Sequence, residues 1–257
     1  MSIKYQGKLK VEKIVIDNVT LSYLRLQTPR VNKGNIICFF TLFLYFIGLL
    51  PIIGETFSLT FFLAAIIPTV LISVWAIIYL IDPYRFEKSY YLFFGIYGVV
   101  NTYVYFLCIV KLLYIDMRVE GKVPFILSLF LFILLIVGVN FLNIKALYSG
   151  TYHKLQNMKS INVAWVSIGA LGYILGQFLL SFIYTDSALY TLLIVLISSL
   201  SILTAYFTIF IHRYYFINKN MEAVKQLYPS FGLPKSERYR KIKRKKKKQK
   251  QKQKQKQ

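Results

Sequence analysis

Six long stretches of this chain contain no aspartate, glutamate, lysine or arginine. They cover residues 34–54, 56–81, 89–110, 123–144, 160–185 and 187–212, and each holds 21 to 26 residues. An α-helix rises about 1.5 Å per residue, so roughly 20 apolar residues are enough to cross the hydrocarbon core of a bilayer. The chain's 32 basic and 10 acidic residues all lie outside these stretches. The pattern therefore predicts six membrane crossings.

The crossings are predicted to be helices. The chain is 56% hydrophobic and 16% charged, whereas soluble domains have about 45–50% apolar and 25% charged residues. The segment Phe125–Val139 is apolar on every side, unlike a barrel strand, which alternates, or a soluble helix, which keeps a polar face. We expect an all-α integral membrane protein, a bundle of six transmembrane helices. The expected spans are about 36–53, 58–81, 89–110, 123–144, 161–184 and 188–211.

The distribution of basic residues predicts the orientation of the bundle. Lysine and arginine accumulate on the cytoplasmic side of membrane proteins. With six spans both termini share one side, and that side receives all basic residues except Lys111, Arg118 and Lys122. The N and C termini are therefore expected to be cytoplasmic, and the residue usage is typical of a bacterial plasma membrane protein.

Three segments outside the spans have distinct patterns. Residues 1–33 form a cytoplasmic N-terminal segment, in which 8–17 and 19–26 alternate around a turn at Asp17. This predicts either a small β-hairpin or an amphipathic stretch on the inner leaflet. Residues 213–234 are expected to form a juxtamembrane helix that ends in a turn at Pro229 and Gly232. The aromatic residues near 84–91 are expected to form an interfacial belt.

Residues 235–257 form a polybasic tail with a single acid, Glu237. Such a composition cannot form a core, so the tail is expected to be disordered. Anionic lipid at the cytoplasmic leaflet attracts basic clusters, and nucleic acid is disfavoured because no aromatic residues are interleaved with the charges. An inert tail that only sets topology is the alternative. The expected lipid contacts are Arg240, Lys241, Lys243, Arg244, Lys245, Lys246, Lys247 and Lys248.

Polar and small residues inside the spans predict how the helices pack. Asn101, Asn140 and Gln177 need partners inside the bundle, because an unpaired amide in lipid is costly. They serve either as links between helices or as the lining of a polar path. Gly172 and Gly176 have the four-residue spacing that lets helix backbones approach closely. Pro68 is expected to kink the second span, as architecture or as a gating hinge.

The chain shows no catalytic, cofactor-binding or metal-binding pattern. His153 and His212 are far apart in the sequence, and Cys38 and Cys108 both fall within spans without metal-ligand spacing. No span contains a carboxylate, which weakens the prediction of an ion-coupled transporter. Lys111 is expected to extend from the outer end of the third span to the membrane interface.

These exclusions leave three functional hypotheses. The leading one is a non-enzymatic accessory or immunity-type protein that binds another membrane or secreted protein. The second is a transporter or channel for a small uncharged solute, in which the three amides would line one path. The third is a membrane-embedded lipid-modifying enzyme.

Overall fold

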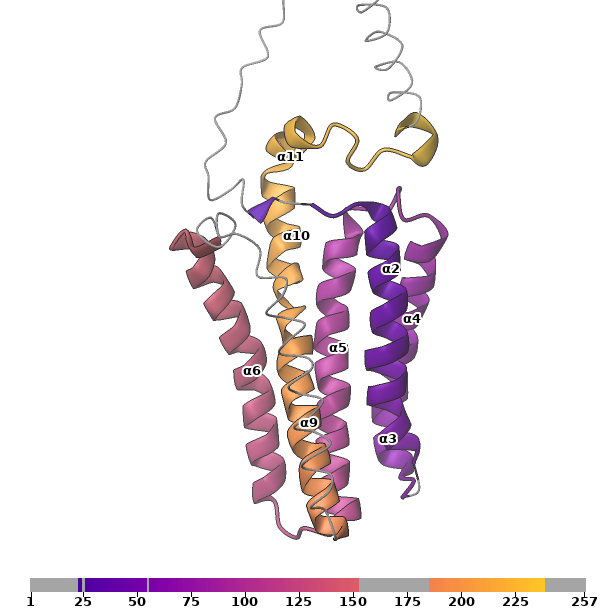
Figure 1. Ribbon diagram of the computed structural model, residues 1–257, viewed down its shortest axis with the longest axis vertical. Helices are drawn as coiled ribbons and strands as arrows, with labels where there is room; N and C mark the ends of the chain where they lie inside the picture. Colours follow the sequence, from indigo (N-terminus) through magenta and orange to yellow (C-terminus); the bar gives the residue numbers. More distant parts are fainter. Residues whose placement is uncertain (1–22, 25, 55, 153–184, 239–257) are drawn as a thin grey trace, which may run out of the picture.

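The computed structural model describes residues 23–24, 26–54, 56–152 and 185–238, which form a bundle of long helices (Figure 1). All regular structure among these residues is helical. The elements are α2 (Pro29–Phe39), η1 (Phe40–Leu49), α3 (Leu50–Ile53), α4 (Leu59–Ile81), α5 (Ser89–Lys111), η2 (Leu112–Asp116), α6 (Val123–Tyr148), α9 (Asp186–Tyr206), α10 (Ile209–Lys219) and α11 (Met221–Leu227).

Five helical stretches are long and apolar enough to cross a membrane. They are Pro29–Ile53, Leu59–Ile81, Ser89–Asp116, Val123–Tyr148 and Asp186–Lys219. These stretches overlap five of the six uncharged windows, and this supports a helical membrane protein. The window predicted to span at 161–184 and most of the predicted hairpin lie outside the described residues.

The first of these helices begins earlier than its uncharged window. The side chain of Thr28 accepts a hydrogen bond from the backbone N–H of Val31, and Pro29 starts the helix. A proline fits the first turn because its missing N–H would have no partner inside the helix there. The helix continues as a π-helix over Phe40–Leu49, a geometry that is rare and usually confined to one turn.

Helix α5 is the centre of the bundle. In the most apolar stretch of this helix 72% of the residues are buried. The corresponding stretch of α4 has 22% of its residues buried, and that of α6 has none. Aromatic rings fill the space around this helix. For example, the centroid of the Phe94 ring lies 4.9 Å from that of Phe207 and 5.5 Å from that of Tyr97. Tyr90 and Tyr91, expected at the membrane interface, are fully buried in this core instead.

Glycines let α5 approach α10 at backbone distance. A Cβ atom placed on Gly95 would lie 2.6 Å from the backbone nitrogen of Ile211. One placed on Gly98 would lie 2.9 Å from the nitrogen of Thr208. Real Cβ atoms do not approach so closely, so the crossing depends on both glycines. Close packing of helices was predicted at Gly172 and Gly176, which lie outside the described residues, and not at Gly95 and Gly98.

The last crossing helix changes pitch in its middle, between α9 and α10. The N–H groups of Phe207 and Thr208 bond to carbonyls three residues earlier, at 3.0 and 2.9 Å, as in a 3₁₀ turn. The side-chain amide of Asn140 donates to the Thr208 hydroxyl at 2.7 Å, and the hydroxyls of Thr102 and Thr204 are 3.0 Å apart. Helices α5 and α6 therefore hold this irregular turn in place.

The two ends of the bundle differ. The first and last described residues lie at the same end, at the top of Figure 1, together with the α4–α5 loop and α11. We call this the basic end. The opposite end, where α3 ends, α4 and α9 begin and residues 117–122 join η2 to α6, is called the loop end.

Candidate functional site

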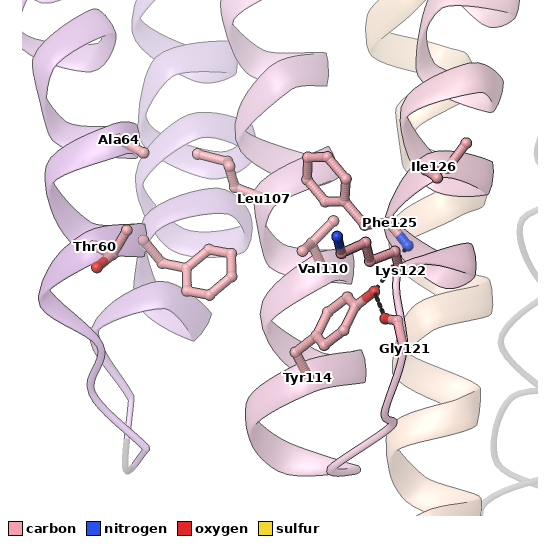
Figure 2. Close-up of a pocket in the computed structure, with 10 residues that line it drawn as sticks. Thr60, Ala64, Leu107, Val110, Tyr114, Gly121, Lys122, Phe125 and Ile126 are labelled. Carbon is pink, nitrogen blue, oxygen red and sulfur yellow. Dashed lines mark hydrogen bonds between the residues drawn. The ribbon is translucent and has the colours of Figure 1, made fainter.

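The α4–α6 groove is a lateral cavity of about 520 Å³ near the loop end (Figure 2). Its size falls within the usual range of ligand pockets, about 300–1,000 Å³. Its walls come from α4, α5, η2 and the start of α6. The lining residues are Thr60, Phe61, Ala64, Leu107, Val110, Tyr114, Gly121, Lys122, Phe125 and Ile126.

Three polar side chains line this groove, Thr60, Tyr114 and Lys122, and the last two have different roles. The Tyr114 hydroxyl donates to the Gly121 carbonyl at 2.6 Å and accepts from the Phe125 N–H at 3.1 Å. It therefore ties η2 to the start of α6. Lys122 is exposed, and Figure 2 shows its ammonium group among the lining side chains. The groove is thus an apolar surface with one cation at its edge.

The α6–α9 groove lies on the other side of α6. It has a volume of about 510 Å³ and is lined by α5, η2, α6 and α9. Most of its lining is leucine, isoleucine and phenylalanine, and its polar members are the hydroxyl residues Thr102, Ser128, Ser198 and Ser201. Ser201 donates to the Ile197 carbonyl in its own helix, at 3.0 Å. This groove too presents an apolar surface.

A row of donors on α5 binds the backbone of the first crossing helix. Tyr97 donates to the Phe39 carbonyl at 2.9 Å and Tyr105 to the Phe43 carbonyl at 3.0 Å. The Cys108 thiol approaches the Gly48 carbonyl at 3.0 Å. Lys111 is buried, and its ammonium group donates to the Pro51 carbonyl at 2.7 Å. The expected extension of Lys111 to the membrane interface is therefore wrong.

This donor row, Tyr97, Tyr105, Cys108 and Lys111, was not predicted from the sequence. Its spacing along α5 is close to whole helical turns, which a search for polar residues on one face could have shown. The acceptors are backbone carbonyls of α2, η1 and α3, and no residue type marks a carbonyl in a sequence.

The predicted interior amides have different surroundings. Asn101 is fully buried beside Tyr105, and neither atom of its amide makes a well-directed hydrogen bond among the described residues. Asn140 is half-buried and donates to the Ile136 carbonyl and to Thr208. The structure joins Asn140 to the turn between α9 and α10, and no hydrogen bond among the described residues connects it to Asn101. Gln177 lies outside the described residues.

Pro68 lies inside α4, which is helical without interruption from Leu59 to Ile81. A hinge at this position stays a prediction. The predicted lipid contacts between Arg240 and Lys248 lie outside the described residues.

A polar chain connects three segments at the basic end. Tyr152 donates to the side-chain oxygen Oδ1 of Asn143 at 2.6 Å, and Nδ2 of the same side chain donates to the Tyr23 hydroxyl at 3.2 Å. The Tyr23 hydroxyl lies 3.1 Å from Nδ1 of His212. Burial raises the pKa of Tyr152 to about 12, so this phenol keeps its proton at neutral pH. These hydrogen bonds fix Tyr23 against α6 and α10.

Comparisons of the chain with protein-family models, with curated proteins and with solved structures give no match.

Proposed function

We propose that this protein is a non-enzymatic accessory protein of the membrane that binds another membrane or secreted protein. Protection against a membrane-active toxin is one concrete form of this role. The observation that carries the proposal is the pair of apolar grooves on either side of α6. An apolar helix or peptide segment fits such surfaces, whereas a polar solute would leave its hydrogen bonds unmade.

The proposal includes six crossings with the basic end in the cytoplasm of a bacterial cell. Helix α6 ends at the basic end and α9 begins at the loop end (Figure 1). The predicted span 161–184 lies between these two points in the sequence and supplies an apolar stretch for a sixth crossing. The excess of basic residues at the basic end supports the cytoplasmic assignment.

Binding of a partner protein in the α4–α6 groove can be tested by site-specific cross-linking. A photoreactive amino acid at Ile126, in the groove, should cross-link to a protein that purifies in stoichiometric amount with the chain from its native membrane. The same amino acid at Val137 should not, although both residues are on α6 and about equally exposed, at 61% and 60%. Filling the groove with Ala64→Phe should abolish co-purification, whereas Val137→Phe should not. Cross-links to lipid alone at both positions would contradict the proposal.

The second candidate is a transporter or channel, and the buried amide of Asn101, which makes no well-directed hydrogen bond among the described residues, favours it. A buried amide without partners is costly, and in a transporter a passing solute would supply those partners. Under the leading proposal the amide is reached by no external solute.

Thiol labelling distinguishes these two candidates. The variants Asn101→Cys and Asn140→Cys are made in a protein that lacks Cys38 and Cys108. We expect both to resist a water-soluble thiol reagent in intact membranes. Glu120→Cys, at an exposed loop residue, is the positive control. Labelling of both, blocked by the same small solute, would favour transport over the accessory role.

The polybasic tail is proposed to contact anionic lipid at the cytoplasmic surface. The 12 basic residues that follow Arg238 support this, since each contributes about 1 kcal/mol of attraction near an anionic surface.

A further inference from the structure

Glu87 is a buried acid in the α4–α5 loop at the basic end. Only 4% of the surface of Glu87 is exposed, although the residue lies at the edge of the bundle. Its carboxylate accepts a hydrogen bond from the backbone N–H of Gly232 at 2.8 Å and forms an ion pair with the Arg238 guanidinium. This is the sole ion pair among the described residues. A buried carboxylate needs such partners.

Both partners of Glu87 belong to one segment, residues 228–238, which we call the C-terminal strap. The Arg238 Nε donates to the Leu233 carbonyl at 2.8 Å, so the guanidinium is bound from two sides. The Tyr84 ring lies 5.1 Å from the Arg238 guanidinium carbon and 5.9 Å from the Lys235 ammonium. Phe231 is buried in the core cluster. The strap is therefore fastened at several points to the α4–α5 loop and the bundle.

Gly232 has the backbone conformation that this contact requires. Its φ is +71°, in the left-handed region that favours glycine. The turn directs its N–H toward Glu87, 145 positions earlier in the chain. A contact of this kind joins segments that could otherwise move apart.

We propose that Glu87 and Tyr84 form a latch for the C-terminal strap, and that anionic lipid headgroups open it by binding the basic residues that follow. Arg238 precedes Arg240, the first residue of the basic cluster, by two positions. A lipid phosphate offers the same charge-assisted hydrogen bonds to a guanidinium as a carboxylate does. Once the basic residues after Arg238 bind the membrane surface, many phosphates lie near Arg238 and compete with the single carboxylate of Glu87. The release step rests on the lipid contact proposed for the tail; the latch itself does not.

Hydrogen exchange of the strap tests the latch in the full chain. In nanodiscs of zwitterionic lipid we expect the peptide containing Gly232 to exchange at least about ten times faster in Glu87→Gln than in the unchanged protein. Arg238→Gln should have the same effect from the other side of the pair. The control is Glu237→Gln, an identical change at an exposed acid of the strap, which should leave the rate unchanged. Equal protection in Glu87→Gln and the unchanged protein would overturn the latch.

Lipid composition tests the release. In nanodiscs with anionic lipid at low salt, the strap of the unchanged protein should exchange as fast as that of Glu87→Gln, and high salt should restore protection. A chain that ends at Arg238 should stay protected in both lipids. Unchanged protection in anionic lipid, or loss of protection in the shortened chain, would overturn the release. Opening by soluble polyphosphate but not by anionic lipid would assign the phosphate to another source.

The lipid contact of the tail is measured separately. A fluorophore at Gln249→Cys, in a background without the native cysteines, should be quenched by nitroxide-labelled anionic lipid. Quenching with a closed strap would contradict the release alone, and absent quenching would contradict the proposed lipid contact.

Discussion

Replacing Gly95 with alanine should destabilise the bundle by about 3 kcal/mol, the upper part of the usual range for overpacked cores. The added Cβ would lie 2.5 Å from Cγ1 of Ile211 and 2.6 Å from its backbone nitrogen. A side chain can rotate away, but the backbone of α10 has to shift, and α10 also carries the contacts to α6 and α11. The measurement is unfolding of the purified protein in mixed micelles with increasing sodium dodecyl sulfate.

Gly138 provides the matched control for this substitution. It lies on α6, and a Cβ placed there would meet no atom within 4 Å. Gly138→Ala should therefore keep or raise stability, because alanine favours a helix by about 1 kcal/mol over glycine. Equal stability of the two variants would mean that α5 and α10 do not pack as described.

Lys111→Glu is expected to cost about 3–5 kcal/mol, the usual effect of leaving a buried charge without its partner. The lysine ammonium donates to the Pro51 carbonyl. A carboxylate at this position would face that carbonyl without a proton to share, and the residue is 3% exposed. The same detergent unfolding assay measures the loss, and we expect the contact between α3 and α5 to open first.

Two further variants separate the hydrogen bond from the general effect of an added acid. Lys111→Met keeps an unbranched side chain, one atom shorter and uncharged, and should lose only about 1–3 kcal/mol, because the Pro51 carbonyl stays buried without a donor. Lys122→Glu makes the same charge change at an exposed site and should alter stability by no more than about 0.5 kcal/mol. A large loss in Lys122→Glu would mean that charge at the loop end matters in itself, independently of the Pro51 contact.

Much of the architecture follows from the absence of charge. Five of the windows without charged residues coincide with five helices. A charge that faces hydrocarbon is costly whichever helices lie nearby, so such windows mark membrane-spanning helices without knowledge of their packing. The ends of the helices were harder to predict. The first helix extends back to Pro29 past Arg30 and Lys33, because the cap at Thr28 decides where it begins.

The packing inside the bundle could not be predicted in the same way. Glycine faces occur at Gly95 and Gly98 as well as at Gly172 and Gly176, and the sequence does not show which helix each face meets. The ion pair of Glu87 with Arg238 joins residues 151 positions apart. The partners of Glu87 depend on how the helices are arranged, so the sequence alone does not pair it with Arg238.

The donor row on α5 has an unequal effect on the two helices that it joins. Its acceptors are carbonyl groups of α2, η1 and α3, which every residue type carries, whereas its donors are the particular side chains of Tyr97, Tyr105, Cys108 and Lys111. An apolar substitution in the first helix leaves these bonds intact as long as the backbone keeps its path. The hydrogen bonds of this interface are thus specified by side chains of α5, whereas the first helix contributes buried packing residues such as Phe40 and Leu44 and is free to change only the residues that it exposes.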